Sequence, residues 1–459
     1  MSGEDQRRLL SWFLPSLLYV AEVVVQTRSL GHVVIPALDE GVYLYAARLV
    51  ADGLVPYRDF SIAHPPFLIA LAAAGLKLTS FDIPRFSFLY VLWVFSAVFP
   101  LWAIARRLSA SRAAAAFGVL LFCISPVFAG FDAHFFALRQ ASTPFLAWGL
   151  AALLVLRRPL LGGVLLGLFS ACVATNGLLA AGILLAFSLW GGPEGRRLAG
   201  RDAVLLWTSF AAVVLVMVAV VAVIPRGVEN VVGTHLTRPR MPEGERLSGL
   251  VTRVFPQNAV LMALGLAGAF LVGGRGRVVS LPPAAVLPLI LLGARSYYPH
   301  YLSIFAFPWA ITAAILGDRL AGTVKARRLL AGGTLAAAVA ATSLMPFVRT
   351  VLRPESAGFF RAVAALRQGP EPLLSYDPIY ALYARKRLTF HYNVVDVQFL
   401  RPVRRNLDPD LFARLLAESG TVLIEPYFAS LLTPERRRAI EERFRPVFVE
   451  PPHVVLVRR

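Results

Sequence analysis

Predominantly apolar stretches, long enough to cross a lipid bilayer, recur along this chain from residue 11 to residue 347. A helix needs roughly 17–25 such residues to cross a membrane, because each residue advances it by only about 1.5 Å. The composition agrees, since 57% of the 459 residues are hydrophobic and only 16% are charged. A single soluble core needs far less apolar material. The chain is therefore predicted to be an all-α polytopic membrane protein.

Short clusters of Arg and Lys separate the apolar stretches and predict their orientation. Basic residues accumulate in the short cytoplasmic loops of membrane proteins. Placing clusters such as Arg106-Arg107 and Arg157-Arg158 inside gives a regular alternation with a cytoplasmic N-terminus. A nucleic-acid binder would instead gather its excess charge, here +19, on one soluble face with aromatic residues between. The distribution therefore excludes nucleic acid as a partner and favours a multi-pass protein surrounded by membrane lipids.

The alternation predicts about eleven spans and a transmembrane domain over residues 1–348. Two of the spans, near 159–173 and 177–190, are short for full crossings and can alternatively form one helix broken at Thr175-Asn176-Gly177. The predicted spans lie near residues 11–28, 85–105, 113–130, 140–156, 159–173, 177–190, 203–224, 257–272, 278–294, 301–317 and 329–347.

The composition changes after residue 348. Proline and charged residues become frequent, and no apolar run reaches spanning length. Short β-type runs predict strands, and helical periodicity predicts two helices, the second capped by Thr433. Residues 349–459 are therefore predicted to form a small α/β domain on the extracytoplasmic face. The predicted strands lie at 373–376, 421–424 and 453–457, and the predicted helices lie at 408–418 and 434–444.

A polar segment over about residues 29–84 forms the first outer loop and carries the acids Asp39-Glu40. Its apolar pieces at 44–50 and 67–78 are too short to span, so they are predicted to lie along the membrane surface as amphipathic helices. Ionisable groups beside a membrane core are costly to desolvate and are therefore candidate functional residues. A partly desolvated carboxylate at this boundary can act as a general base toward a hydroxyl.

The loop resembles the first outer loop of the GT-C glycosyltransferases, above all their protein O-mannosyltransferase and aminoarabinose transferase branches. The resemblance lies in Asp39-Glu40-Gly41-Val42-Tyr43-Leu44-Tyr45, Pro56-Tyr57-Arg58-Asp59-Phe60 and His64-Pro65-Pro66. It implies a GT-C-like fold and an enzyme that transfers a hexose or pentose, with inversion, from a polyprenyl phosphate to a hydroxyl of a glycan, lipid or protein. It also implies that Asp39 is the catalytic base and that Glu40 is its neighbour.

Basic residues on the predicted outer side run against the positive-inside trend and form a candidate phosphate site. A phosphate leaving group departs as an anion, so it needs positive charge or hydrogen-bond donors rather than a strong general acid. Arginine suits this task because its planar fork can donate two bonds. Interfacial snorkelling and an aromatic belt are the alternatives. The candidates are Arg58, Arg139, His235, Arg295, Tyr298 and His300.

Asp59 and His64 each have more than one assignment. Asp59 can pair with Arg58 or Arg85, orient the base, or bind a divalent cation together with Asp39. A hard cation wants several oxygen ligands, and the loop offers few, so no cofactor is predicted to be obligatory. His64 can hydrogen-bond a substrate phosphate or fasten the turn that follows it.

Two further expectations concern neighbouring positions. Asp82 and Arg85 are expected to form an interfacial salt bridge. Asn176 stands where the aminoarabinose transferase branch commonly has a lysine that could contact phosphate. A neutral amide cannot replace that charge, which weakens the expectation of the same donor sugar and shifts the phosphate task to the arginines.

Two rival functions remain open at this point. A transporter or flippase of a lipid-linked or anionic substrate is the main one, because helices broken near Gly and Asn are typical of transporter binding sites. A lipid-glycan ligase would tend to carry its key Arg and His in a late outer loop. The first outer loop is too elaborate for a simple connector, which favours a glycosyltransferase acting on the outer side of a bacterial or archaeal cytoplasmic membrane.

Overall fold

The computed structural model describes most of the chain, in two compact units. The first unit comprises residues 1–28, 88–219 and 240–348, and the second comprises 29–87, 220–239 and 349–459. The predicted span at 329–347 lies outside the described part. The described residues are 3–27, 38–109, 111–125, 136–192, 195–233, 242–249, 251–252, 255–293, 302–320, 355–389 and 409–459.

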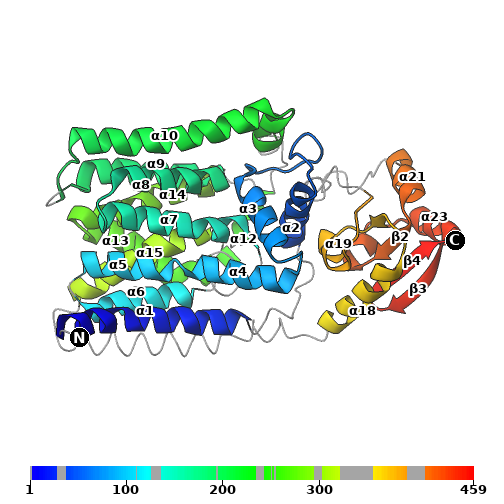
Figure 1. The fold of residues 1–459 in the computed structure, drawn as a ribbon, viewed down its shortest axis with the longest axis horizontal. Coiled ribbons are helices and arrows are strands. Elements are labelled where there is room, and N and C mark those ends of the chain that lie inside the picture. The colour runs from blue at the N-terminus through cyan, green and yellow to red at the C-terminus, as the bar shows by residue number, and fades with distance from the viewer. Residues whose placement is uncertain are drawn as a thin grey trace. The chain divides into compact units, whose positions relative to one another are not determined.

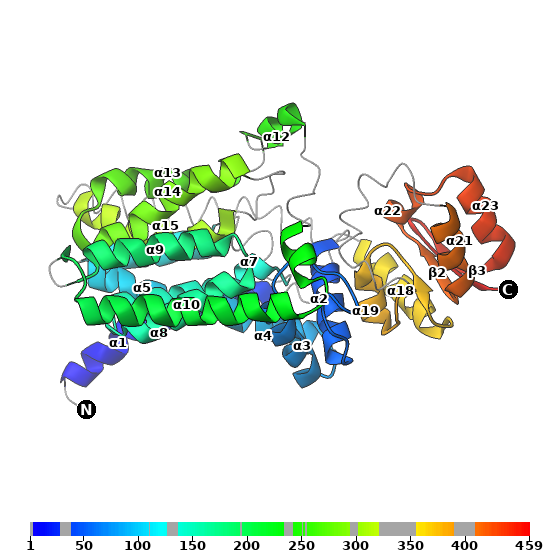
Figure 2. The same cartoon turned by 90° about the horizontal axis from the view of Figure 1, so that it is seen from above.

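Apolar helices make up the first unit. Helix α7 packs against α8, α8 against α9 and α9 against α14, and these four lie side by side in Figures 1 and 2. Helix α4 (Ile83–Phe95) begins in the second unit and ends in the first. The other helices are α1 (Gly3–Thr27), α5 (Val98–Leu108), α6 (Arg112–Cys123), α7 (Leu138–Leu154), α8 (Pro159–Cys172), α9 (Asn176–Trp190), α10 (Gly200–Val223), α12 (Glu243–Gly249), α13 (Phe255–Leu271), α14 (Arg277–Gly293) and α15 (Ser303–Leu320).

Small residues let these helices approach one another closely. Gly163 and Gly167 form a small-xxx-small pair on α8, a pattern that favours close packing of helices in lipid. A Cβ atom at Gly163 would lie 2.0 Å from the Oγ of Ser209, and one at Gly167 would lie 2.7 Å from the Cβ of Val213. Both partners belong to α10, so this helix contact excludes any larger side chain at these two positions of α8.

A helix occupies each predicted span that falls within the described residues, and the prediction of a mostly helical fold with apolar helices is confirmed. The short pair near 159–173 and 177–190 forms two helices that pack together, rather than one broken helix. Within the part of the chain that the structure describes, three helical stretches are long and apolar enough to cross a membrane by length and composition, namely 83–108, 200–223 and 274–293. The number of spans and their orientation stay predictions.

A small mixed sheet lies at the C-terminal end of the second unit (Figure 1). Its strand order is β1-β2-β4-β3, with β1 and β2 parallel and the other pairs antiparallel. The strands are β1 (Leu373–Leu374), β2 (Thr421–Ile424), β3 (Phe444–Glu450) and β4 (His453–Arg458). The helices of this unit are α2 (Leu38–Ala51), α3 (Phe67–Leu78), α18 (Glu355–Gln368), α19 (Pro378–Ala384), α21 (Pro409–Glu418), α22 (Pro426–Ala429) and α23 (Pro434–Arg443), together with the π-turn η3 (Glu229–Gly233).

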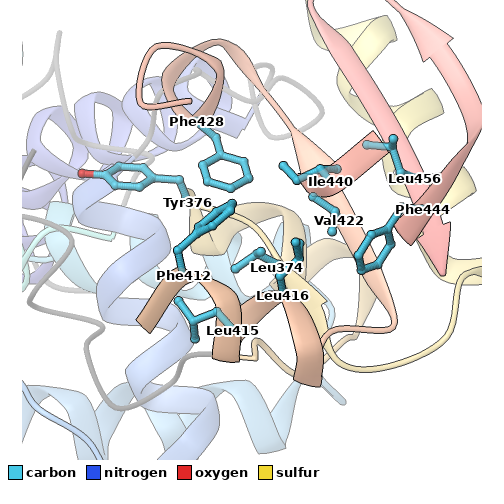
Figure 3. Packing of buried hydrophobic residues seen from close by; sticks show 10 residues of the cluster. All are labelled: Leu374, Tyr376, Phe412, Leu415, Leu416, Val422, Phe428, Ile440, Phe444 and Leu456. Carbon is cyan, nitrogen blue, oxygen red and sulfur yellow. The ribbon is translucent and has the colours of Figure 1, made fainter. Parts of the chain in front are cut away.

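The core of this sheet follows from the register of its strands. Val422 of β2 and Leu456 of β4 point to the same face, where they meet α21 and α23, because the two residues are direct partners across the paired strands (Figure 3). Helix α18 packs against β3 and β4. The cluster in Figure 3 consists of Leu374, Tyr376, Phe412, Leu415, Leu416, Val422, Phe428, Ile440, Phe444 and Leu456.

Several C-terminal elements match their prediction and others do not. Helix α23 is capped by Thr433, whose side chain accepts from the N–H of Arg436, as expected. The expected strand at 373–376 is shorter, and the expected helix at 434–444 ends at Arg443, because Phe444 opens β3. Sequence reasoning missed β3, an edge strand whose exposed residues break the apolar alternation that marks a strand.

Replacing Ile440 by Ala is expected to lower the free energy of unfolding of the C-terminal sheet by about 2–5 kcal/mol, because the side chain is fully buried in the cluster. Val447→Ala is the matched control, since half of that side chain is exposed, and it should cost less than about 1 kcal/mol. Pulse proteolysis of the intact protein in urea measures both. Equal costs would contradict the assignment of this core.

Candidate functional site

The acids Asp39 and Glu40 lie in the first turn of helix α2. The expectation of a surface helix confined to 44–50 is therefore wrong, because the helix starts at Leu38 and takes in both acids. Carboxylates are favourable in a first helical turn, where the helix dipole is positive. The structure describes the backbone of Asp39. It also describes the side chain of Glu40, a residue that is 7% exposed.

Helix α2 is buried along most of its length rather than amphipathic. Leu44, Tyr45, Ala46 and Ala47 are almost fully buried, and the helix packs against α3 and α19 within the second unit. A helix forms over the expected residues 67–78, as α3, and its location along the membrane surface stays a prediction. The segment between α1 and α4 therefore supplies a buried helix that carries two acids at its start.

The carboxylate of Glu40 lies within electrostatic reach of α19. Burial raises the pKa of the Tyr383 hydroxyl, and the negative charges of Glu40 and Asp82 raise it further. Tyr383 is thus held neutral and belongs to the helix on which α2 packs.

Arg58 and Asp59 occupy the tip of a tight turn between α2 and α3. The Asp59 carboxylate accepts from the N–H of Val55 at 2.7 Å, and it pairs with the Arg58 guanidinium at 2.8 and 2.9 Å. Asp59 raises the pKa of Arg58. Of the expected partners, the structure selects Arg58, while Arg85 pairs with Asp82 at 3.6 Å as expected. The exposed guanidinium of Arg58 is thereby oriented by its neighbour.

A left-handed residue shapes this turn. Tyr57 has φ of 69°, a conformation that is costly for a bulky side chain. Its ring is buried, and its hydroxyl donates to the carbonyl of His64 at 2.7 Å. The His64 ring in turn lies 3.1 Å from the Tyr43 hydroxyl of α2, through Nε2. These contacts match the fastening role weighed for His64, and its contact with phosphate stays a prediction.

Arg139 and Asn176 belong to the first unit, at the starts of α7 and α9. Asn176 donates to the Ser142 hydroxyl at 3.0 Å and to the carbonyl of Phe169 at 3.0 Å. Ser142 donates onward to the carbonyl of Arg139 at 2.7 Å. A chain of hydrogen bonds therefore connects the starts of α7 and α9, and it includes the buried neutral amide of Asn176.

The remaining candidates cannot be placed. His235, Arg295, Tyr298 and His300 lie outside the described residues. Within the described residues, no group of three or more His, Cys, Asp or Glu side chains could hold a metal ion. The roles of all the candidate residues, including a cation site at Asp39 and Asp59, stay predictions.

A buried polar cluster in the second unit escaped sequence reasoning. Asp377, Tyr380, Glu425 and His453 are each at most 2% exposed. The Tyr380 hydroxyl and the Nε2 of His453 are 2.7 Å apart, and Asp377 caps α19 by accepting from the N–H of Ile379 at 3.0 Å. Asp before Pro is a helix-start signal that could have revealed this cap. The other members are scattered in sequence and give no local signal.

No family model and no curated protein matches this chain. Among solved structures, it is similar to ArnT from Cupriavidus metallidurans bound to undecaprenyl phosphate, with 18% identity, a TM-score of 0.67, and coverage of 96% of this chain and 97% of that chain. The apo state of ArnT gives 17% identity with the same TM-score and coverage. The oligosaccharyltransferase AglB from Archaeoglobus fulgidus, in complex with an inhibitory peptide and a dolichol-phosphate, has 13% identity and a TM-score of 0.46, covering 97% of this chain and 75% of that chain.

These similarities concern the fold. The likeness to ArnT shows that this chain has an ArnT-like fold over nearly its full length, in agreement with the resemblance that the sequence suggests. The multi-pass membrane character that the apolar helices indicate agrees with an ArnT-like fold.

Glu425 makes the stability of the second unit depend on pH in a way that can be tested. Burial, and then the charge of Asp377, raise the pKa of the Glu425 carboxyl to about 8. The unfolded carboxyl ionises at about 4.3, so the folded protein binds the extra proton and loses stability as pH rises between these two values. We expect the free energy of unfolding to fall by at most about 1.4 kcal/mol per pH unit in this range.

Glu425→Gln should remove that slope, because the amide cannot ionise and nearly keeps the shape. The measurement is the difference in free energy of unfolding between the two proteins from pH 4 to 9, in which the titration of His453 cancels. A constant difference would refute the raised pKa.

Proposed function

We propose that this protein is a membrane glycosyltransferase that transfers a sugar from a polyprenyl-phosphate donor to an acceptor hydroxyl on the outer face of the cytoplasmic membrane. The observation that carries the proposal is the likeness in fold, over nearly the whole chain, to ArnT, which was solved with undecaprenyl phosphate. The acids at the start of α2 supply the chemical group that such a transfer requires.

In the proposed reaction the acceptor oxygen attacks the anomeric carbon of the donor sugar from the side opposite the phosphate. A new carbon–oxygen bond forms as the bond to the phosphate oxygen breaks. The acceptor proton passes to the carboxylate of Asp39, and the polyprenyl phosphate leaves as an anion. A general base of this kind contributes about 10²–10⁴-fold to a rate.

The leaving phosphate requires positive charge rather than a proton donor. Arg58 supports this assignment, since its guanidinium is exposed and is oriented by Asp59 in the same unit as α2. Arg139, His235, Arg295, Tyr298 and His300 complete the proposed phosphate site. Glu40 is assigned to orienting the start of α2, because its side chain is buried.

A transporter or flippase of a lipid-linked substrate is the second candidate. Hydrogen bonds through Ser142 connect the start of α7, at Arg139, with the start of α9, at Asn176. This contact favours a transporter, because helix ends inside a membrane protein are typical of transporter sites. Transfer and transport differ in their products, since only transfer releases polyprenyl phosphate from its sugar.

Asp39→Asn should lower the rate of sugar transfer by about 10²–10⁴-fold, because the amide keeps the shape but cannot accept the proton. The measurement is the rate of polyprenyl-phosphate release by the purified protein. Asp82→Asn is the matched control, since that acid lies in the same segment and pairs with Arg85. Wild-type activity in the Asp39 variant would remove Asp39 as the base.

Arg295→Ala should weaken binding of the lipid donor by about 10–100-fold, as expected for the loss of a charge-assisted hydrogen bond, and should weaken acceptor binding much less. Direct binding of undecaprenyl phosphate measures the effect. Arg85→Ala, which removes a guanidinium engaged in a surface ion pair, serves as the control. Unchanged donor affinity in the Arg295 variant would exclude this residue from the site.

A further inference from the structure

One face of helix α2 is fixed to a short stretch of the C-terminal segment. Gly41, Tyr45 and Arg48 lie on this face, because residues four and seven apart on a helix are neighbours. All three contact residues between 377 and 388, which form α19 and the chain after it. These residues belong to the same compact unit as α2.

Gly41 makes the closest approach. A Cβ atom there would lie 2.8 Å from the Oδ1 of Asp377 and 2.9 Å from the backbone nitrogen of Ile379. These two atoms form the cap of α19, in which Asp377 accepts from the N–H of Ile379. Glycine costs a helix about 1 kcal/mol relative to alanine. The contact with the α19 cap gives a physical reason for a glycine at this position.

Tyr45 and Arg48 hold the far end of the same face. The Tyr45 hydroxyl accepts from the N–H of Leu388 at 2.7 Å, and burial raises its pKa to about 12, which keeps it neutral. The Arg48 guanidinium donates to the carbonyls of Arg385 and Lys386, each at 3.4 Å. These carbonyls follow the C-terminal end of α19, where a cation is favourable. The two helices are thus joined at both of their ends.

We propose that residues 377–388 are a platform that positions the start of α2, and that Gly41 is a positioning residue for the base at Asp39. The proposal rests on the proposed function for its catalytic consequence. Asp39 precedes Gly41 by two positions, so a shift of α2 away from the α19 cap moves the base directly. A displacement of about 1 Å can cost about 10²-fold in rate.

The platform explains why the C-terminal domain accompanies the transfer chemistry. We assign no residue of the C-terminal domain to proton transfer or to donor binding. Residues of this domain fix the position of α2 through the α19 cap at Asp377, the backbone N–H of Leu388 and the carbonyls of Arg385 and Lys386. These groups belong to the backbone or are hydrogen-bonded to it. Such contacts form only when α19 is folded, and the geometry of the base then depends on this domain.

The test uses the purified full-length protein with Gly41→Ala and, as a milder change, Tyr45→Phe, which leaves the N–H of Leu388 without its acceptor. Both should raise the hydrogen-exchange rate of amides in α2. They should lower kcat for polyprenyl-phosphate release by about 10–100-fold and change the Kd for undecaprenyl phosphate less than twofold.

Gly358→Ala is the matched control. That glycine also lies in a helix of the second unit, α18, and its Cβ would make only ordinary van der Waals contacts, the nearest at 3.6 Å from the Nδ1 of His453. This variant should leave both exchange in α2 and kcat unchanged. If Gly41→Ala does not fold, Tyr45→Phe alone carries the test.

The outcomes separate the two proposals. Unchanged exchange in α2, or a kcat equal to that of the wild type, overturns the platform. A matching loss of donor affinity also overturns it, since that indicates general damage rather than displacement of the base. Raised exchange in α2, in a protein whose wild type releases no polyprenyl phosphate, supports the docking of α2 and refutes the proposed function instead.

Discussion

The cost of taking polar groups out of water governs how this chain is built. In the apolar helices, buried hydroxyls such as those of Ser170 and Thr312 donate to carbonyls one turn earlier, so each is satisfied within its own helix. Charged groups lie mainly between these helices or in the second unit. Some of them form ion pairs there, as Arg58 does with Asp59. The candidate acids Asp39 and Glu40 likewise lie in the second unit, at the start of α2.

The second unit collects such segments from distant parts of the chain. It joins residues 29–87, a short piece near residue 230 and the C-terminal sheet. The bond from Leu388 to Tyr45 spans 343 positions. Closing so long a loop costs conformational entropy. The burial of apolar side chains on α2 offsets this cost. The candidate acids lie on this helix. The geometry of the candidate base therefore depends on how the C-terminal segment packs against α2.

Sequence reasoning was strong where the signal is local. The bounds of α3, the Thr433 cap and the Asp82–Arg85 pair all follow from residues within one or two turns of each other. It failed where a signal depends on distant partners. The start of α2 is buried against α19, so it lacks the amphipathic pattern of a surface helix, and β3 is an exposed edge strand. The Asp377, Tyr380, Glu425 and His453 cluster likewise exists only in three dimensions.

Release of free polyprenyl phosphate is the most direct test of the account. The purified protein is incubated in detergent with a panel of polyprenyl-phosphate sugars and candidate acceptors, and the liberated lipid phosphate is measured. We expect release from at least one donor, at a rate that depends on an acceptor hydroxyl. The contrary result is no release from any donor together with movement of the same lipids across sealed vesicles. That result would make the protein a transporter and leave Asp39 without a proton to take.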